Sequence, residues 1–534
     1  MRTPPTILQG ICRTTILNIT CLSIVVTAAL VILHTSPYVA SNLDIVPDSV
    51  EYSVGSAHLV QDGNYFITID GTKFPPRYSP AFSLMLAPSY LIFGHDEIGN
   101  GIYIVTAFAL IGIMAAYAIG YAVSGCPGGV LAAGFMLLLS DYLELGRRIM
   151  ADVPGAALSL LLCWLYLHMS RRQQYGNSLM FASGCVIALA SGLRPALLVM
   201  VLPFMLHLSR RKVSGLLYML LPIAAVIGLT LLYNDRTFGS LFRNGYNFWC
   251  PVPYDFVNLT LSPSYLKDNL KTLLSTPALP SMITTGLCMV LLRKLDLIEK
   301  STALVMKEIS YFILFASSPY LVFHLLYFYQ STRFFLPITC LFAAVTGGVV
   351  GRFFIRKTYN YAAIIFSAAL LVFAFAQNIT SPPLVLWRRA MADAVAKFTP
   401  DDAVIIAATD PGYLGYLVAE RSHRIIIPLN RNVEYASKLI AARKISAIEP
   451  SPDGWWDHRA AGLINAGATE AVRVVAVDRP DVVAMYLNSG RRVFLLQDMT
   501  TQEDLNEAEK FIKNYRTSES APGIFELRQK NGGN

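Results

Sequence analysis

The sequence has few charged residues for its length. Asp, Glu, Lys and Arg make up 15% of its 534 residues, whereas apolar residues make up 54%. Soluble domains contain about 25% charged residues, so this composition excludes an ordinary soluble protein. Apolar windows of about 20 residues, each long enough to cross the hydrocarbon core of a bilayer, recur along the chain. We therefore predict an integral, multi-pass membrane protein.

Motifs typical of metal, redox or nucleotide sites are also missing. The eight cysteines include no Cys-x-x-Cys pair, and the histidines show neither His-x-x-x-His nor His-Glu-x-x-His spacing. The sequence has no Walker or dinucleotide-binding glycine motif and no evident internal repeat. These observations argue against a zinc site, a disulfide framework and a nucleotide-binding domain. We expect no metal and no organic cofactor.

The net charge of +8 does not indicate nucleic acid binding, because Lys and Arg cluster between the apolar runs. Such clusters mark the cytoplasmic side of a membrane protein. With these clusters inside, we predict about eleven spans, a cytoplasmic N-terminus and an external C-terminus. The predicted spans lie near residues 14–34, 98–124, 128–143, 153–169, 178–193, 195–209, 213–233, 276–293, 308–328, 334–351 and 359–377.

Two stretches admit an alternative. The apolar segment Ile16–Leu33 follows basic residues as in a cleavable signal peptide, but the many later spans favour an uncleaved first span. A single re-entrant segment over residues 178–209 is the alternative to two spans that meet at Arg194-Pro195. One segment would place the later basic clusters on the wrong side of the membrane. We therefore expect two spans there.

The composition divides the chain near residue 384. Residues 1–383 contain the spans and an external loop at 35–97, in which Asp48–Tyr65 and Ser79–Phe93 read as two surface helices flanking Asp70-Gly71. Residues 384–534 have the composition of a soluble protein, so we predict a polytopic α-helical membrane domain followed by a small extracytoplasmic α/β domain.

Short apolar runs place the elements of this C-terminal domain. A capping box at Thr500 and Glu503 predicts a helix that extends to about Tyr515. The other predicted elements are strands at Ala403–Ala408, Arg424–Pro428 and Ile524–Leu527, and a βαβ unit formed by Arg473–Val477, Asp481–Asn488 and Val493–Leu496.

Three acidic residues are candidates for catalysis. Asp48 and Glu51 lie three residues apart, so a helix that begins at Pro47 places both on one face. Asp152 precedes Pro154 at the external end of a predicted span. Helix capping alone explains residues of this type at these positions. A carboxylate at the membrane surface can also remove the proton of an acceptor hydroxyl, and both roles are compatible.

Several Lys and Arg residues lie on the predicted external side, although these residues are usually more frequent on the cytoplasmic side of membrane proteins. Contact with lipid headgroups is one explanation, and binding of a phosphate or diphosphate is the other, because guanidinium groups bind such anions through two hydrogen bonds. Positive charge also stabilises a leaving phosphate. The candidate phosphate-binding residues are Lys73, Arg77, Arg147, Arg148, Arg194 and Arg333.

These segments resemble the GT-C glycosyltransferases, in particular bacterial relatives of protein O-mannosyltransferases and of the lipid A aminoarabinose transferase. The resemblance extends over about residues 10–380, and the C-terminal domain is also in the expected place. The segments that carry it are Asp48–Tyr52, Gly63–Tyr65, Pro75–Pro80, Phe93-Gly94, Arg148–Pro154, Gly192–Pro195 and Arg333–Pro337.

The resemblance implies a reaction and roles for residues. The family uses polyprenyl-phosphate-linked sugars and inverts the anomeric centre. Asp48 matches its catalytic base, Asp152 matches its second acidic position, and Arg77 falls near a basic residue that faces the lipid phosphate. Many relatives have Asp-Glu at the first position, whereas here Ser49 follows Asp48. No metal is clearly required in this branch.

We expect a membrane glycosyltransferase that moves a sugar from a polyprenyl-phosphate donor to a glycan, lipid or protein acceptor. Its expected location is the bacterial inner membrane, with the bilayer, the lipid-linked donor and the acceptor as partners. One alternative is a transporter or flippase, which would show charged or broken segments at mid-span and inverted repeats. A non-catalytic membrane assembly protein is the other, and it would tolerate Asp48→Asn.

Overall fold

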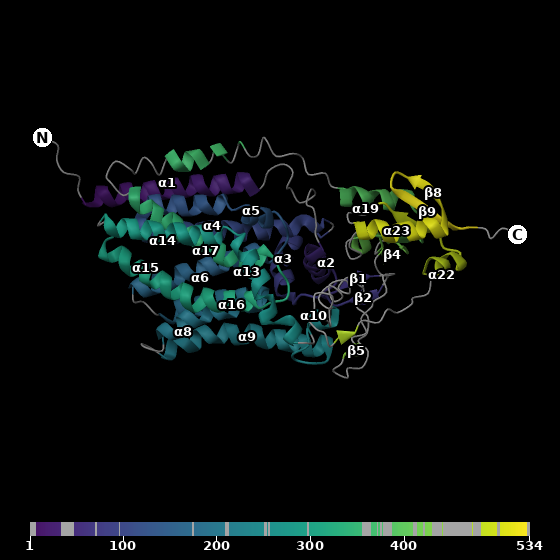
Figure 1. Cartoon of the computed structure of the whole chain (residues 1–534), viewed down its shortest axis with the longest axis horizontal. Helices are drawn as coiled ribbons and strands as arrows, with labels where there is room; N and C mark the ends of the chain where they lie inside the picture. Colours follow the sequence, from purple (N-terminus) through teal and green to yellow (C-terminus); the bar gives the residue numbers. More distant parts are fainter. Residues whose placement is uncertain are drawn as a thin grey trace. The chain divides into compact units, whose positions relative to one another are not determined.

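The computed structural model shows a largely helical chain with a small sheet near the C-terminus (Figure 1). It describes residues 7–33, 47–69, 72–95, 97–172, 176–208, 213–249, 254, 257–295, 298–354, 365–370, 372–373, 376, 387–408, 414–419, 422–429, 440–441, 472–473, 482–498 and 502–530.

The chain forms two compact units. The helical unit comprises Met1–Leu43, Gly101–Thr230 and Leu261–Leu384. The loop-and-sheet unit comprises Asp44–Asn100, Leu231–Thr260 and Val385–Asn534. The segment at residues 47–95, which we call the first loop, therefore belongs to the same unit as the C-terminal sheet.

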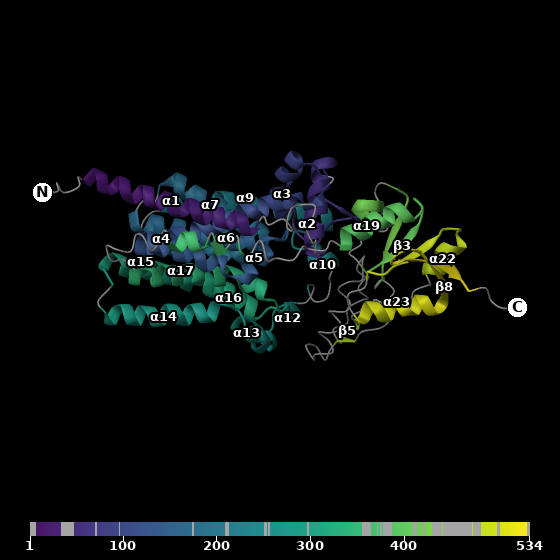
Figure 2. The ribbon, with the colours of Figure 1, turned by 90° about the horizontal axis from the view of Figure 1, so that it is seen from above.

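The helical unit is a bundle of apolar helices. In Figures 1 and 2, α1, α4, α6 and α17 run alongside one another, and these helices are in contact. The longer elements are α1 (Ile7–Leu33), α4 (Ile102–Leu137), α6 (Asp152–Arg172), α7 (Asn177–Leu193), α9 (Val213–Phe238, whose last turns fall in the other unit), α14 (Ala278–Lys294), α15 (Lys300–Phe312) and α17 (Leu336–Gly351).

Shorter elements connect these helices. They are η3 (Ile98–Gly101), α5 (Ser140–Gly146), η4 (Pro195–Val201), α8 (Leu202–Leu208), η5 (Pro263–Tyr265), α13 (Leu266–Leu274), η6 (Ile313–Ser317), α16 (Ser318–Leu325), η7 (Thr332–Phe335) and η8 (Arg352–Phe354). Of these, η6 is a π-helix that joins α15 to α16 and places one wide turn directly before α16.

Helix α4 contains a reversal of the chain. Its backbone leaves the helical region at Ser124 and at Gly125, where φ is 69°. An added methyl group on Gly120, before this break, would overlap the carbonyl of Gly128, which lies after it. These two residues would lie about 12 Å apart along a straight helix. The contact therefore shows that the two parts of α4 fold back on each other. The two spans at 98–124 and 128–143 stay a prediction.

Close backbone packing continues from α4 to α17. Added methyl groups on Gly347 and Gly351 would overlap backbone atoms of Ala132 and Gly128. The Ser124 hydroxyl also donates to the Gly348 carbonyl at 2.6 Å. Small residues allow helices to approach this closely inside a membrane, where packing rather than water drives association.

Five helices in the described part of the chain are long and apolar enough to cross a membrane, and the count is six if the bent pair Pro263–Leu274 and Ala278–Lys294 forms one span. The protein is therefore an integral, multi-pass membrane protein. The count of eleven stays a prediction, because Asn177–Leu193 and Pro195–Leu206 are shorter apolar helices. Of the predicted span at 359–377, the structure describes residues 365–370, 372–373 and 376.

The first loop contains the two predicted helices and a hairpin. Helix α2 (Pro47–Gln61) begins at the predicted Pro47, and α3 (Pro80–Phe93) matches the second predicted helix. Between them, β1 (Ile67–Ile69) pairs antiparallel with β2 (Thr72–Phe74). The sequence analysis missed these strands. The helices α10 (Gly245–Trp249) and α12 (Val257–Thr260) belong to the same unit.

The C-terminal part is a small α/β domain. Its mixed sheet has the order β4-β3-β7-β9-β8, in which β3 pairs parallel with β4 and β7, and β9 pairs antiparallel with β7 and β8. Its core includes Val404, Ile406, Val493 and Leu527. Its strands are β3 (Val404–Ala407), β4 (Ile425–Pro428), β7 (Val493–Leu496), β8 (Tyr515–Ala521) and β9 (Ile524–Gln529). Its helices are α19 (Trp387–Phe398), η9 (Gly415–Ala419), α22 (Val482–Asn488) and α23 (Gln502–Asn514).

Strand β7 lies between β3 and β9 in this sheet. The first strand predicted for the βαβ unit, Arg473–Val477, lies almost wholly outside the described residues. Of that segment, only Arg473 is described. It belongs to β6 (Val472–Arg473), which pairs antiparallel with β5 (Ile440–Ala441). The helix and the second strand of the predicted unit are present.

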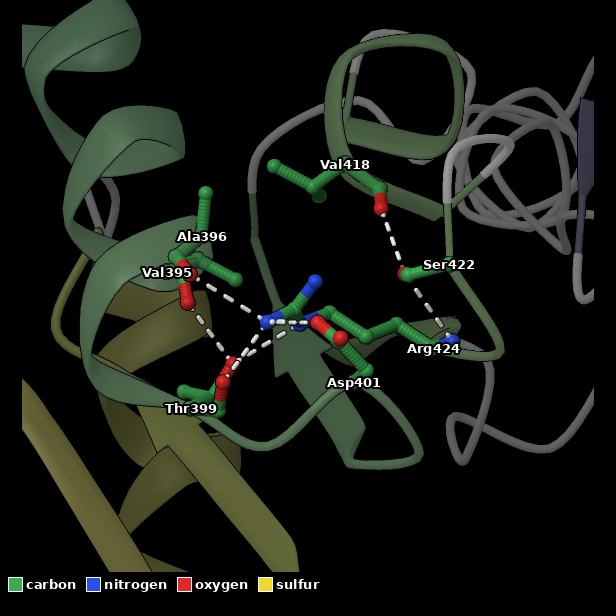
Figure 3. A network of polar contacts seen from close by, with 7 residues as sticks. All are labelled: Val395, Ala396, Thr399, Asp401, Val418, Ser422 and Arg424. Atoms are coloured by element: carbon green, nitrogen blue, oxygen red, sulfur yellow. Dashed lines mark hydrogen bonds and ion pairs between the residues drawn. The ribbon is translucent and has the colours of Figure 1, made fainter.

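A buried arginine joins α19 to β4 (Figure 3). The Arg424 side chain donates from Nη2 to the Thr399 carbonyl at 2.6 Å and to the Ala396 carbonyl at 3.2 Å. Its Nε donates to the Thr399 hydroxyl at 3.1 Å, and Asp401 forms an ion pair with it at 2.9 Å. These acceptors include carbonyls at the end of α19, which have no partner within the helix. Arg424 therefore has a structural role.

The π-helix η9 contacts the first loop within the loop-and-sheet unit. The Tyr416 hydroxyl donates to the His95 carbonyl at 2.6 Å, and the Tyr416 ring meets the His58 ring edge-on at 5.6 Å. An added methyl group on Gly415 would lie 2.8 Å from the Thr68 carbonyl. The C-terminal domain and the first loop thus support each other.

Candidate active site

The N-terminal turn of α2 brings together two of the predicted acids and one predicted cation. Pro47 opens the helix and Asp48 lies in its first turn, where the helix dipole favours a negative charge. The Glu51 side chain is 6% exposed and pairs with Arg77, which is 3% exposed. Arg77 donates from Nε to Glu51 Oε1 and from its backbone N–H to Glu51 Oε2 at 2.6 Å. Both carboxylate oxygens are therefore occupied.

Asp48 lies close to this pair. Burial raises the pKa of Glu51 above its ordinary value, Arg77 opposes the rise, and the charge of Asp48 adds to it. Burial also raises the pKa of Tyr78, with Asp48 as the next cause. Asp48 lies one helical turn before Glu51 on α2, so its charge can act on this pair. Asp48 itself is half-buried.

A series of tyrosine rings extends from this acidic turn. Tyr52, one residue after Glu51, packs on Tyr78 with ring centroids 4.3 Å apart. Tyr78 meets Tyr246 edge-on at 5.5 Å, and Tyr246 packs on Tyr254 at 4.7 Å. The rings fix the position of the α2 N-terminus against the rest of the first loop.

Lys73 lies on β2 in the same unit. Its side chain is exposed, and its Nζ lies 4.1 Å from the centre of the Phe66 ring. This is the geometry of a cation–π contact.

The helical unit holds a second acid–arginine pair. Asp152 is the first residue of α6, and its side chain is 2% exposed. Its Oδ1 accepts a hydrogen bond from Arg194 Nη2. Arg194 lies between α7 and η4 with an extended backbone, the conformation that the following Pro195 favours. The Arg194 side chain is 15% exposed, so this pair is more open than Glu51–Arg77.

Aromatic residues and a second arginine surround this pair. The guanidinium carbons of Arg194 and Arg333 each lie 5.4 Å from the centre of the Phe334 ring. The ring of His324 stacks on Phe334 at 5.0 Å, and Tyr320 lies 4.5 Å from His324. The Tyr320 hydroxyl donates to the Phe334 carbonyl at 3.0 Å. Residues at the α7–η4 junction, on α16 and on η7 therefore surround the Phe334 ring.

The other two predicted cations have partners of a different kind. Arg147 donates from Nη2 to the Ile32 carbonyl at the end of α1, at 2.7 Å. Arg148 pairs with Glu144 at 3.0 Å, and both side chains are substantially exposed. The first contact ties α1 to the segment before α6, whereas the second is a surface pair of low energetic value.

The sequence analysis missed three groups in this region. His324 and Tyr320 lie within an apolar run and show no spacing pattern that would mark them. Asp141 on α5 is half-buried; burial raises its pKa, Glu144 adds to the rise, and a hydrogen bond from Thr332 opposes it. The position of Asp141, within the loop that also carries Arg147 and Arg148, was the only signal available.

The structure divides the predicted site residues between the two units. Asp48, Glu51, Lys73 and Arg77 lie in the loop-and-sheet unit. Asp152, Arg147, Arg148, Arg194 and Arg333 lie in the helical unit. Each group combines a carboxylate with guanidinium or ammonium groups and aromatic rings, a combination suited to an anionic substrate. Within the described residues, no three His, Cys, Asp or Glu side chains form a group that could hold a metal ion.

Comparisons with known proteins identify the fold. No family model and no curated protein matches the sequence. The structure is similar to ArnT from Cupriavidus metallidurans in the apo state, with a TM-score of 0.56 and 12% identity over 97% of this chain and 98% of that one. It is also similar to ArnT bound to undecaprenyl phosphate, with a TM-score of 0.54 and 11% identity over 96% and 97% of the two chains.

A third match is the archaeal oligosaccharyltransferase AglB from Archaeoglobus fulgidus, with a TM-score of 0.48 and 11% identity over 96% of this chain and 74% of that one. The likeness to AglB is too weak to support an argument. The likeness to ArnT covers nearly the whole of both chains and confirms the predicted GT-C fold.

Proposed function

We propose that this protein is an inverting glycosyltransferase that moves a sugar from a polyprenyl-phosphate carrier to an extracytoplasmic acceptor. The observation that carries the proposal is the fold that the chain shares, end to end, with ArnT, which has been crystallised with undecaprenyl phosphate. Such a reaction needs a base and positive charge. The acidic turn of α2 contains a candidate for the first, and the arginines near Asp152 are candidates for the second.

In the proposed reaction, an acceptor hydroxyl attacks the anomeric carbon as the bond from that carbon to the phosphate oxygen breaks. The polyprenyl phosphate leaves with the bonding electrons, and Asp48 takes the acceptor's proton. Asp48 suits this role because it is half-buried at a helix N-terminus, next to a tyrosine-rich surface. General base catalysis of this kind contributes about 100- to 10,000-fold to the rate.

Arginines would stabilise the negative charge that develops on the leaving phosphate. Arg194 and Arg333 suit this role, because both approach the Phe334 ring and Arg194 remains partly exposed. Asp152 would orient Arg194 as the second acidic group. Lys73, Arg147 and Arg148 would be secondary contacts for the anion or for lipid headgroups.

Glu51 and Arg77 receive a different role in this proposal. Because both are nearly fully buried and Arg77 occupies both carboxylate oxygens of Glu51, we assign them the task of holding α2 against the rest of the first loop. They would then position Asp48 without touching the substrate.

The proposal also includes a location and a topology. The chain would lie in a bacterial inner membrane with about eleven spans, a cytoplasmic N-terminus, and the first loop and C-terminal domain outside. The basic clusters between apolar runs support this orientation. The acceptor would be a glycan, a lipid or a protein. No metal takes part in the proposed reaction, so turnover should persist in EDTA.

The first test compares a deletion strain complemented with wild-type protein, Asp48→Asn or Asp62→Asn. Asp62 ends the same helical segment, pairs with His58 and has no place in the proposed site, so it is the matched control. We expect Asp48→Asn to reduce transfer by at least about 100-fold while expression and membrane insertion persist. We expect Asp62→Asn to act like wild type.

The readouts are the lipid-linked sugars and the cell-surface glycans. Accumulation of one lipid-linked sugar together with loss of that sugar from one surface glycan supports the proposal and identifies both substrates. Wild-type turnover by Asp48→Asn would refute the base assignment. If the lipid-linked sugar instead accumulated only on the cytoplasmic side of the membrane, the protein would be a flippase.

A further inference from the structure

His324 is a buried histidine that the proposed reaction does not yet use. It lies near the end of α16 and is 6% exposed. Neither ring nitrogen has a hydrogen-bond partner in the part of the chain that the structure describes. Imidazole always offers at least one N–H donor, and buried polar groups in native proteins are almost always hydrogen-bonded. An unsatisfied ring in this position indicates a site for a ligand.

The surroundings of His324 hold the ring in place. The ring stacks on Phe334 with an interplanar angle of 13°, and Tyr327 meets it edge-on at 6.1 Å. Tyr320 contacts it at 4.5 Å, and the Tyr320 hydroxyl is itself fixed by the Phe334 carbonyl. The ring therefore needs no rearrangement to meet a ligand, and this preorganisation favours binding.

The charges near His324 determine what kind of ligand fits. Arg194 and Arg333 approach the same Phe334 ring on which His324 stacks. Asp152 supplies one negative charge, through its pair with Arg194. The two guanidinium groups outnumber this carboxylate, so the cluster favours an anion. A phosphate group accepts several hydrogen bonds at once, and its oxygens suit guanidinium and imidazole N–H donors alike.

We propose that His324 is a phosphate-binding residue, whose ring N–H donates to an oxygen of the same phosphate group that Arg194 and Arg333 bind. This inference rests on the proposed function, which makes the phosphate that of the polyprenyl carrier. Free inorganic phosphate has the same chemistry, and the experiment below separates the two sources.

The test measures binding of undecaprenyl phosphate to the purified full-length protein in lipid nanodiscs. His324→Phe keeps a flat ring but removes both nitrogens, whereas His324→Gln retains an amide donor. We expect His324→Phe to weaken binding about tenfold, the loss of one hydrogen bond to an ionised group. We expect His324→Gln to stay within about threefold of wild type.

Two controls separate binding from folding. His168→Phe, on α6, makes the same change at a half-buried histidine that contacts Trp164, and should leave affinity unchanged. Thermal unfolding of His324→Phe should match or exceed that of wild type, because the variant buries no unsatisfied polar atom. If His324→Phe unfolded at a lower temperature than wild type and bound undecaprenyl phosphate with wild-type affinity, His324 would have a structural role only.

Inorganic phosphate serves as a second probe, added as a competitor of undecaprenyl phosphate. If His324 contacts the phosphate itself, His324→Phe weakens both ligands by the same factor. A loss confined to the lipid would place the ring against the prenyl chain and overturn the inference. Equal affinity of wild type and His324→Phe would also overturn it, while leaving the proposed function intact. A wild-type protein that does not bind undecaprenyl phosphate would refute both.

Discussion

The two buried acid–arginine pairs differ in how completely they are enclosed. In the loop-and-sheet unit, Glu51 receives hydrogen bonds on both carboxylate oxygens from one residue, Arg77, and both side chains are almost inaccessible. In the helical unit, Asp152 accepts from Arg194 through its Oδ1 oxygen, and the guanidinium remains partly exposed. The same chemical pair thus occurs in a closed and in an open form.

This difference separates a structural role from a binding role. In the closed pair, one arginine occupies both oxygens of the carboxylate, and removal of that arginine mainly affects folding. An open pair next to an unsatisfied histidine can still meet a ligand. Sequence patterns placed both pairs in one list of candidates, whereas their enclosure assigns them different tasks. Substitutions in these two pairs, and in a third pair for comparison, test that assignment through their effect on the free energy of unfolding.

The largest effect is expected for Arg77→Ala. The variant leaves the Glu51 carboxylate buried without its partner, so the free energy of unfolding should fall by about 3–5 kcal/mol. The double variant Glu51→Leu, Arg77→Met replaces both charges with apolar groups of similar size and should recover most of this loss. Thermal unfolding of the purified protein in detergent measures both. If the single and double variants unfolded alike, the pair would not be closed as described.

An intermediate effect is expected for Arg194→Met. Asp152 then loses its arginine but keeps the N-terminal dipole of α6, so the loss of stability should be about 1–3 kcal/mol. Under the proposed function, transfer should fall by about 100-fold, far more than the unfolded fraction explains. Asp152→Asn combined with Arg194→Met should restore stability and leave transfer low. If the double variant recovered both stability and transfer, the Asp152–Arg194 pair would have a structural role only.

The smallest effect is expected at a pair in the C-terminal sheet that joins an exposed arginine to a buried glutamate. Arg492 lowers the pKa of Glu526 through a hydrogen bond of 2.6 Å, and Arg528 contributes further. Because the pKa of Glu526 is lower in the folded protein, the unfolded chain binds more protons than the folded one when pH falls below about 4.5. The pair therefore stabilises the folded protein at neutral pH, and this stabilisation is lost as pH falls through the lowered pKa. Arg492 is 52% exposed, which limits the contribution to at most about 1 kcal/mol.

The measurement compares thermal unfolding of wild type and Glu526→Gln at pH 7 and pH 4. The variant should be slightly less stable than wild type at pH 7, and this difference should be smaller at pH 4, below the unfolded-state pKa of about 4.5. A difference that grew towards low pH would contradict the assigned sign.

Local patterns predicted the elements whose signals are local. The start of α2 at Pro47 followed from a proline and an acid in the first turn, and β3, β4, β7 and β9 followed from apolar runs. Strand β8 was missed because five of its seven residues are exposed and polar or charged, so it lacks an apolar alternation. The hairpin of β1 and β2 was missed because each strand has only three residues.

Long-range pairing could not be read in the same way. The neighbour of β7 is β3, about 90 residues earlier in the chain, and no local pattern specifies that choice. The same limit applies to the candidate site. The spacing of Asp48 and Glu51 predicted a shared helix face, but not that Arg77 would occupy Glu51. A single histidine in an apolar run carries no spacing signal, so His324 became visible only through its burial and its neighbours.

The π-turn of η6 has a consequence for how this protein could diverge. A wide turn holds one residue more than a regular helical turn, so it rotates everything after it by about 100°. Tyr320 and His324 follow η6 directly, and their direction therefore depends on the number of residues in that turn. Deleting one residue from Ile313–Ser317 would redirect both side chains without replacing them. In related chains, small insertions or deletions at this turn could change ligand preference while every polar residue stays the same.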